Sequence, residues 1–279
     1  MPRRKATLAR RFAGAGRRIA KAARRLGRFA RRVKRWWRPA PQPAKYLMAA
    51  LVILILWLLS NAIYQVIRKP SELFFPVSGT LNKNPSETWR RYESIFEKYS
   101  TSVMTSEFLA AIAQVEGSGN PVARTYWRWS LTTQPFEVYR PASSAVGMYQ
   151  ITDGNFAEAR RYCIRDHTVV QDGPWNDWHS CWFNGLYARV VPSHAVELTS
   201  AYLDRSVALI LERQRIASTT LQRKQQLAAV IHLCGAGAGD EFARRRFRLI
   251  EGQRCGDTLV RGYLERVSSM QAAFERLRH

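Results

Sequence analysis

The sequence predicts a mostly α-helical domain behind a single N-terminal transmembrane helix. Three observations support this: one long uncharged apolar run, apolar residues at helical spacing through most of the remaining chain, and almost no alternating strand patterns. At 279 residues and 46 % hydrophobic, the chain is able to bury a core, which excludes wholesale disorder. We expect a basic cytoplasmic tail (1–45), a transmembrane helix (46–67), a linker with a first helix (68–100) and the main domain (101–279).

The transmembrane helix is predicted by the 22 uncharged residues from Tyr46 to Ile67. About 20 apolar residues span a hydrocarbon core of ~30 Å as a helix. Residues 1–45 hold 17 Lys and Arg and no acid, against Arg68 and Lys69 directly after the run, which places the N-terminus in the cytoplasm. The alternative is a cleaved signal peptide, since residues 60–62 (SNA) resemble a cleavage site, but a 45-residue leader is long for that class.

Positive charge is concentrated in the tail. From residue 70 onward, the chain has 25 Lys and Arg and 21 Asp and Glu. The main domain is therefore not a basic nucleic-acid-binding domain, and no nucleic-acid partner is expected. The tail interleaves arginines with sparse apolar residues, so we expect it to lie on anionic membrane lipids. The alternative is that it docks a cytoplasmic partner or nucleic acid.

The four cysteines all follow the apolar run, which suggests disulfides in an exported domain. Three connectivities are possible. Proximity in the sequence favours Cys163–Cys181 and Cys234–Cys255. The alternative is four reduced thiols in the core.

Helix signals recur through the exported part. Asn84-Pro85-Ser86-Glu87 combines an N-cap, a proline at the first position and a glutamate at the third, and so marks a helix start. Residues 70–83, with two prolines and a glycine, indicate a short linker. Further helices are predicted at about 105–116, 194–217, 221–234 and 258–277.

The segment 105–121 (TSEFLAAIAQVEGSGNP) carries the first chemical signal. Leu109, Ile112 and Ala113 form an apolar stripe, and the next position on that stripe is Glu116. Burial disfavours the charged form of a carboxyl group, and a carboxyl that keeps its proton near neutral pH can act as a general acid. The alternative is a glutamate that points to solvent at a frayed helix end.

The second signal is residues 143–152 (SSAVGMYQIT), where small residues permit close backbone approach and Gln150 offers an amide. Together, EGSGNP and SSAVGMYQIT resemble the signature of the lytic transglycosylase (SLT domain) family, usually E-S-x-x-N-P followed by G-A-x-G-L-x-Q-I. The resemblance covers about residues 100–240. It implies a goose-type lysozyme-like helical fold that cleaves peptidoglycan between N-acetylmuramic acid and N-acetylglucosamine.

The resemblance also implies roles for individual residues. Glu116 matches the catalytic acid/base, which in this family works without a second carboxylate and yields 1,6-anhydromuramoyl products. Gln150 matches a substrate-binding glutamine, and Gly147 a glycine that keeps the groove open. Met148 and Tyr149 fall at hydrophobic groove positions. The expected substrate-binding set is Ser144, Gly147, Met148, Tyr149 and Gln150, with no cofactor and no metal.

The sequence also departs from the family pattern. Gly117 stands where serine is usual, and the gap between Glu116 and Gln150 is longer than typical. A later Y-N-A-G motif is matched only by the Ala-Gly of residues 233–237 (LCGAG). The role of its tyrosine must therefore pass elsewhere or be missing, and His232 is the candidate substitute.

Two further patterns have no assigned role. Residues 175–183 (WNDWHSCWF) are unusually aromatic, which fits either one wall of a glycan groove or, as favoured here, an aromatic core beneath a disulfide-pinned loop. The histidines show no metal-ligand spacing; they are His167, His179, His194 and His232.

These observations lead to two functional hypotheses. The first is a bacterial inner-membrane lytic transglycosylase with a periplasmic catalytic domain, opening the cell wall for an envelope-spanning machine; that last element rests on analogy with family members. The second is a non-catalytic glycan-binding or assembly module of a secretion or conjugation apparatus. Hydrolysis by water, as in lysozymes, would differ from the first only in the ends formed.

Overall fold

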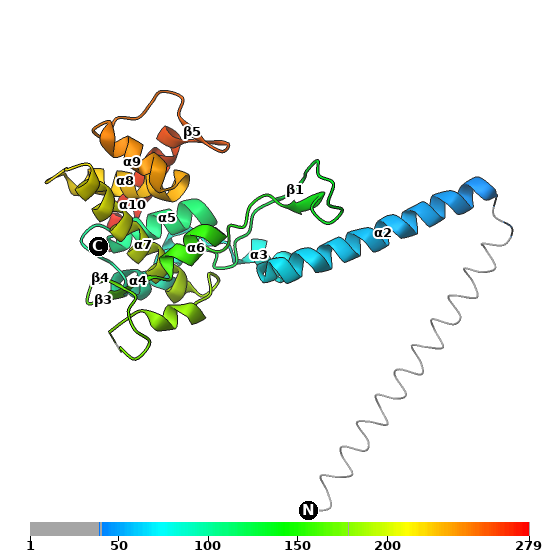
Figure 1. The fold of residues 1–279 in the computed structure, drawn as a ribbon, viewed down its shortest axis with the longest axis horizontal. Helices are drawn as coiled ribbons and strands as arrows, with labels where there is room; N and C mark the ends of the chain where they lie inside the picture. The colour runs from blue at the N-terminus through cyan, green and yellow to red at the C-terminus, as the bar shows by residue number, and fades with distance from the viewer. Residues whose placement is uncertain (1–38, 40, 178, 279) are drawn as a thin grey trace, which may run out of the picture. The chain divides into compact units, whose positions relative to one another are not determined.

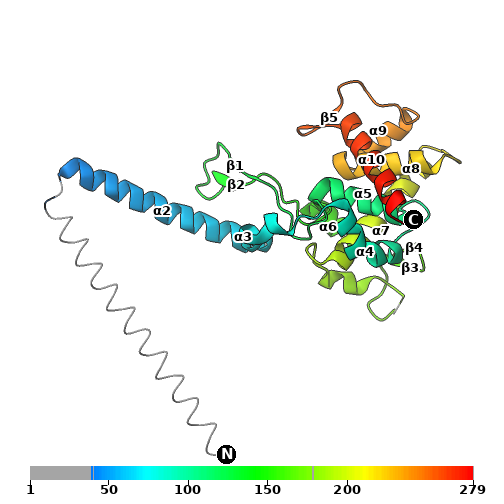
Figure 2. The same ribbon diagram turned by 180° about the vertical axis from the view of Figure 1, so that it is seen from behind.

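The computed structural model of the protein describes residues 39, 41–177 and 179–278 (Figures 1 and 2). The described chain is mostly helical, as predicted, and divides into two units between Ile63 and Tyr64. The amphipathic tail predicted for residues 1–45 lies outside the described residues except at its end.

Helix α2 (Gln42–Arg68) contains the predicted transmembrane run and extends it by four residues at the start and one at the end. Its 27 residues reach ~40 Å, and it is long and apolar enough to cross a membrane. Its large apolar side chains from Tyr46 to Ile67 are mostly exposed, as a lipid-facing helix requires. The chain therefore has one candidate membrane-spanning helix in its described part.

The unit Tyr64–His279 is built around helices of which α4, α5, α7, α8 and α10 are close to those predicted, whereas α6 and α9 were not predicted. Helix α4 packs on α5 and α10, α5 packs on α10, and α7 packs on α8, which in turn packs on α9. Their bounds are α4 (Pro85–Lys98), α5 (Ser106–Gly117), α6 (Asp153–Ala159), α7 (Pro192–Arg213), α8 (Leu221–Cys234), α9 (Ala236–Arg244) and α10 (Val260–Arg278). Asn84 caps α4 through the predicted capping box with Glu87.

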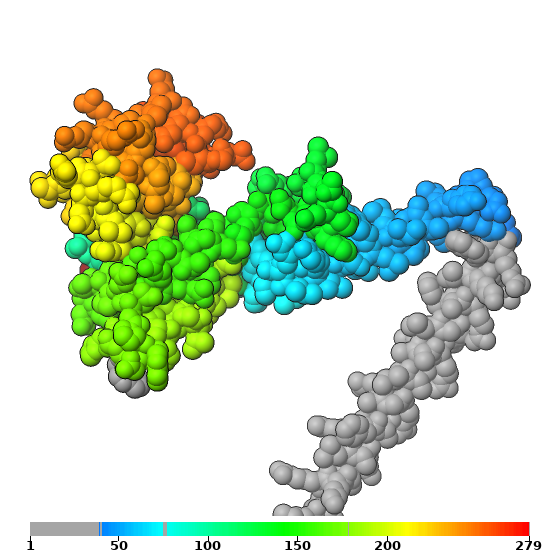
Figure 3. Space-filling model, viewed as in Figure 1, coloured from blue at the N-terminus to red at the C-terminus, as the bar shows by residue number. Residues whose placement is uncertain are grey.

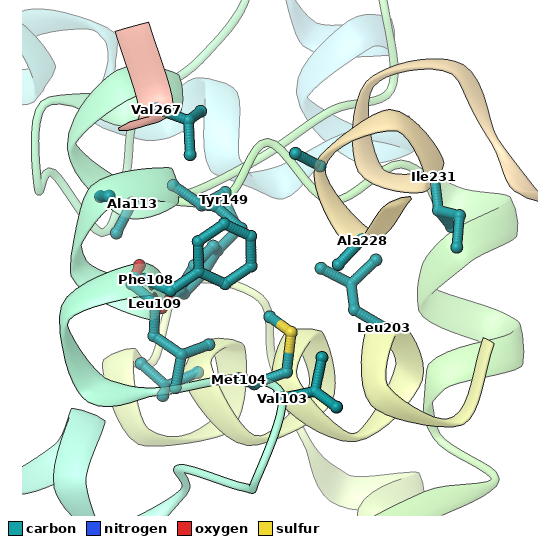
Figure 4. Close-up of a cluster of buried hydrophobic side chains, with 14 of the residues drawn as sticks. Val103, Met104, Phe108, Leu109, Ala113, Tyr149, Leu203, Ala228, Ile231 and Val267 are labelled. Atoms are coloured by element: carbon teal, nitrogen blue, oxygen red, sulfur yellow. Dashed lines mark hydrogen bonds between the residues drawn. The ribbon is translucent and has the colours of Figure 1, made fainter. Parts of the chain in front are cut away.

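The core surrounds the central part of α5, where apolar residues on all sides of the helix are buried. Residues 108–113 (FLAAIA) have at most 2 % exposure. Figure 4 shows part of this core, with Phe108 and Leu109 near Tyr149 and with Leu203, Ala228 and Ile231 from α7 and α8. The last turn of α5 is thus held by the most rigid part of the domain.

Three short antiparallel hairpins correct the expectation of almost no strands. They are β1 (Trp127–Trp129) with β2 (Tyr139–Pro141), β3 (Tyr162–Arg165) with β4 (Thr168–Gln171), and β5 (Arg254–Cys255) with β6 (Thr258–Leu259). Strands of two to four residues are too short to show alternation. The β3–β4 turn places Asp166 and His167 at positive φ, the conformation of a tight hairpin turn that here lacks the usual Asn-Gly.

Both predicted disulfides are confirmed. Cys163 of β3 bonds Cys181, which precedes the 3₁₀ turn η3 (Trp182–Leu186). Cys234 at the end of α8 bonds Cys255 of β5. Each bridge has a Cα–Cα distance of 5.5 Å and closes a loop against a helix or strand of the core.

The predicted linker is folded. Residues 70–83 contain short helical turns, η1 (Pro70–Phe74), α3 (Phe75–Ser78) and η2 (Gly79–Leu81), and Glu72 is buried. Helix α4 places Trp89 and Phe96 in the common core, so the expected boundary between residues 100 and 101 falls inside one packed unit.

The aromatic stretch is not a buried core. Trp175 is 82 % exposed and Trp182 is half-exposed, although Cys181 and Asn184 beside them are buried. The favoured interpretation of this stretch is therefore wrong for these two tryptophans, because the disulfide pins the loop through its backbone and leaves the rings outside.

Candidate active site

Glu116 lies in the last turn of α5. Thr105 caps the start of the helix, and Ser118, in the left-handed conformation at φ 50°, ends it. The amide of Gly119 then donates back to the carbonyl of Ala113. This tight ending fixes the last turn, and the Glu116 side chain retains 17 % exposure, so the carboxylate is partly buried and still reachable from solvent.

His232, in the last turn of α8, is the first neighbour of that carboxylate. Its Nε2 lies 3.7 Å from Oε1 of Glu116. Burial lowers the pKa of His232, although the charge of Glu116 and a hydrogen bond to the Tyr149 backbone oppose that shift. The imidazole is therefore neutral at neutral pH. The structure places the candidate substitute from the sequence beside Glu116.

Tyr263 of α10 is the second neighbour, and sequence reasoning missed it as a site residue. Its side chain is 2 % exposed, and burial, together with the nearby Glu116 carboxylate, raises the pKa of its hydroxyl well above the usual value. The hydroxyl lies beside the Glu116 carboxylate and interacts with it as a hydrogen-bond donor, although not at regular hydrogen-bond geometry. A tyrosine at a core-facing helical position was the available signal, because a buried hydroxyl needs a polar neighbour.

The two motifs meet at Gly117. A Cβ on Gly117 would lie 2.8 Å from both the Cα and the carbonyl oxygen of Met148, closer than real Cβ contacts allow. The backbone of the second motif therefore rests directly on the end of α5. This contact explains why glycine stands at Gly117, where the family pattern has serine.

The second motif forms a tight turn. Val146 and Ile151 exchange backbone hydrogen bonds of 3.2 and 3.1 Å, and the Gln150 amide donates to the Gly147 carbonyl at 3.0 Å. Gly147 has φ +81°, and a Cβ there would lie 2.5 Å from the carbonyl oxygen of Arg189. Gly147 is thus needed for close packing of the turn, and its expected role in keeping a groove open stays a prediction.

Met148 and Tyr149 do not line a surface. Both are fully buried, and the Tyr149 hydroxyl donates to the Leu109 carbonyl at 3.1 Å within the core. The expectation that their side chains contact substrate is corrected: with Gly117 against the Met148 backbone, the turn directs both side chains inward. Met148 and Tyr149 are therefore part of the core that packs against α5.

Ser144 and Gln150 are half-buried and keep polar atoms at the surface of the turn. The Gln150 side-chain amide donates to the carbonyls of Gly147, at 2.9 Å, and Ala123, at 3.2 Å. Ser144 accepts a hydrogen bond from the Asp153 amide at 3.1 Å. For these two residues, the expected substrate contact stays a prediction.

Glu116 differs from the other buried glutamates in its partners. Each of the others is satisfied by strong donors: Glu72 by Arg124 and Trp127, Glu107 by Arg278, Glu137 by Arg68 and Arg140, and Glu197 by Tyr187 and the Ile164 amide. Among the residues that the structure describes, Glu116 instead has the imidazole of His232 3.7 Å from its carboxylate, and the lowered pKa of His232 favours the uncharged ring. No lysine or arginine of the described chain pairs with Glu116.

A hollow on the surface is lined by residues other than Glu116 and its neighbours. This hollow of about 580 Å³ lies between the start of α4 and the end of α10, and Asn84, Glu87, Arg90 and Arg276 line it. Within the described ranges, no group of three or more His, Cys, Asp or Glu side chains is placed to hold a metal ion.

Comparisons with known proteins do not assign this site, because no protein-family model matches the chain and no curated protein matches it. The chemistry of the site follows from the geometry around Glu116.

Proposed function

We propose that the protein is a membrane-anchored peptidoglycan lytic transglycosylase with a lysozyme-like fold, in which Glu116 is the catalytic acid/base. The observation that carries the proposal is the set of partners of Glu116: a neutral histidine at 3.7 Å and a protonated tyrosine, with no cation of the described chain paired to it. The contact between Gly117 and Met148, which joins the two family-like motifs, supports it.

The neutral partners matter because of what a cation would do. A lysine or arginine beside a carboxylate favours its charged form and so opposes proton donation. His232 and Tyr263 place no positive charge beside Glu116. In the proposed reaction Glu116 gives up a proton and later takes one back.

In the reaction Glu116 acts twice, first as a general acid and then as a general base. Glu116 donates its proton to the glycosidic oxygen between N-acetylmuramic acid and N-acetylglucosamine, and the bond from C1 to that oxygen breaks. The 6-hydroxyl of the same muramic acid attacks C1 and releases its proton to Glu116. The intramolecular attack gains from effective concentration and requires neither water nor a second carboxylate. The product carries a 1,6-anhydro end.

Tyr263 and His232 serve as positioning residues in this scheme. Tyr263 takes the place of the tyrosine missing from the partial motif at residues 233–237, because its protonated hydroxyl is available to the Glu116 carboxylate. His232 fills the other side of Glu116 without adding charge.

The proposed location follows from α2 and the disulfides. We propose that α2 spans the bacterial inner membrane with the N-terminus in the cytoplasm, its basic tail on anionic lipids and the disulfide-bonded domain in the periplasm. In that position, the enzyme opens the wall locally for an envelope-spanning machine.

The test is digestion of purified peptidoglycan by the full-length protein in detergent, with products identified by mass spectrometry. We expect anhydro-ended muropeptides from the wild type and a 10²- to 10⁴-fold slower release from Glu116→Gln. The matched control is Glu107→Gln on the same helix, where a carboxylate paired with Arg278 is neutralised. That variant is expected to lose stability and to retain activity in its folded fraction.

Two outcomes would overturn the proposal. Reducing ends that are lost in Glu116→Gln would mean hydrolysis by water, as in a lysozyme. No cleavage by a folded wild-type protein that still sediments with peptidoglycan would favour the non-catalytic glycan-binding module.

A further inference from the structure

The β1–β2 hairpin carries exposed apolar side chains that the proposed reaction does not use. Leu131 near its tip is fully exposed, and Trp129 and Tyr126 are 66 % and 65 % exposed. Between Tyr126 and Phe136 the one charged residue is Arg128. Figure 3 shows this green segment protruding from the surface of its unit. Such a concentration of apolar surface on one protruding element indicates a binding surface.

The hairpin is attached to the end of α2. The ring of Phe136 stacks on Tyr64, with centroids 5.3 Å apart, and the Phe136 carbonyl accepts a hydrogen bond of 2.6 Å from Gln65 Nε2. The next residue, Glu137, forms an ion pair with Arg68. These contacts fix the returning arm of the hairpin along the last two turns of α2.

The base of the hairpin is held by buried charges. Glu72 accepts hydrogen bonds from Arg124, at 2.7 Å, and from the indole of Trp127, at 2.8 Å, and it pairs with Lys69 at 3.3 Å. Lys69 also donates to the carbonyls of Ser143 and Ala145. The hairpin is therefore a rigid extension of the residues that directly follow α2.

The level of Phe136 relative to a membrane follows from these contacts. The uncharged run ends at Ile67, and Arg68, whose side chain reaches solvent, marks the level of the lipid headgroups. Tyr64 lies one helical turn before Arg68, at the boundary between headgroups and acyl chains, where tyrosine and tryptophan are enriched. Phe136, stacked on Tyr64, lies at that same boundary.

We propose that the tip of this hairpin, residues 129–136, enters the interfacial layer of the membrane that α2 spans. This inference rests on the membrane anchoring in the proposed function. Leu131 and Trp129 supply the apolar contact, and Arg128 is placed to meet lipid phosphate. A single helix leaves a domain free to swivel, whereas a second contact fixes its orientation. The hairpin thus keeps the Glu116 site at a set distance from the membrane.

The experiment places the full-length protein in nanodiscs of phosphatidylcholine and phosphatidylglycerol. Leu131→Cys carries an environment-sensitive fluorophore, and lipids with a spin label at carbon 5 of the acyl chain serve as quencher. We expect at least twofold quenching at this position. The matched control is Leu186→Cys, since Leu186 is another highly exposed leucine of the same unit, and it is expected to remain unquenched. Leu56→Cys within α2 is the reference for membrane insertion.

Quenching at the three positions distinguishes failure of the hairpin contact from failure of the membrane anchor. If Leu56→Cys is quenched and Leu131→Cys behaves like Leu186→Cys, the hairpin does not contact lipid and the inference is overturned while the anchor stands. If Leu56→Cys is also unquenched, the anchor itself fails and both proposals fall. Non-reducing gels of each variant verify that both native disulfides are intact.

Discussion

Two glutamates of this molecule are placed in opposite environments. Glu72, between α2 and the β1–β2 hairpin, is 4 % exposed and is surrounded by Lys69, Arg124 and the indole of Trp127. Glu116, at the end of α5, adjoins a neutral histidine and a tyrosine that keeps its proton. No lysine or arginine of the described chain forms an ion pair with Glu116, whereas Glu72 has two cationic partners.

The difference separates a carboxylate that holds structure together from one to which we assign a catalytic role in the proposed function. A buried carboxylate among strong donors is locked in its charged form, and removing it leaves unpaired cations in the interior. A carboxylate among neutral donors contributes less to folding and is able to change its protonation state. The following experiments test whether the two glutamates differ in this way.

The largest effect is expected from Glu72→Gln. Because the substitution leaves Lys69 and Arg124 buried without their anion, we expect the free energy of unfolding to fall by about 3–5 kcal/mol, measured by urea denaturation. Glu137→Gln is the control, since its partners Arg68 and Arg140 reach solvent and should make its loss smaller. Equal losses in the two variants would contradict the proposed locking of Glu72.

The next effect concerns the turn beside Glu116. Gly147→Ala forces a side chain into positive φ and toward the Arg189 carbonyl, so we expect a loss of about 2–3 kcal/mol in stability. Gly154→Ala is the matched control, because Gly154 lies in helix α6 with open space around its Cβ position, and alanine there should stabilise by roughly 0.5–1 kcal/mol. Thermal unfolding of both variants measures the contrast. A neutral Gly147→Ala would show that the turn does not pack as described.

A smaller effect is expected from Tyr263→Phe, which removes the hydroxyl facing Glu116. We expect about a tenfold fall in kcat with little change in KM, because the hydroxyl orients the carboxylate and does not contact substrate. Stability should change little, since the lost hydroxyl has no regular hydrogen bond among the described residues. A shifted acidic limb in the pH–rate profile would distinguish positioning from packing. An unchanged kcat would remove Tyr263 from the site.

The smallest effect is a pH dependence from His232. Burial lowers its pKa in the folded state below the unfolded value of about 6.5, so the folded protein binds fewer protons. The stability from neutral His232 is therefore full above about pH 6.5 and is lost as the pH falls below it. We expect His232→Gln to reduce this loss between pH 7 and pH 5 by on the order of 1 kcal/mol. His194→Gln is the comparison, because burial lowers the pKa of His194 as well. An unchanged slope in His232→Gln would show that the imidazole is not held neutral.

Local signals in the sequence predicted much of the fold. The capping box at Asn84, the apolar stripe of α5 and the uncharged run of α2 each depend on residues within a few turns of one another. The disulfides followed from proximity along the chain, with loops of 18 and 21 residues. The short hairpins escaped notice because two to four residues show no period.

The sequence by itself determined helices α2, α4, α5, α7, α8 and α10, the two disulfides and the position of Glu116 at the end of α5, because periodicity, capping and short loops depend on neighbouring residues. Helices α6 and α9 are too short to show a clear period. Only the tertiary structure decided the partners of Glu116, the inward direction of Met148 and Tyr149, and the attachment of the hairpin to α2. The partner of a buried polar group is chosen by packing between elements far apart in the chain. Tyr263 reaches Glu116 because α10 packs against α5, and no spacing in the sequence records that contact.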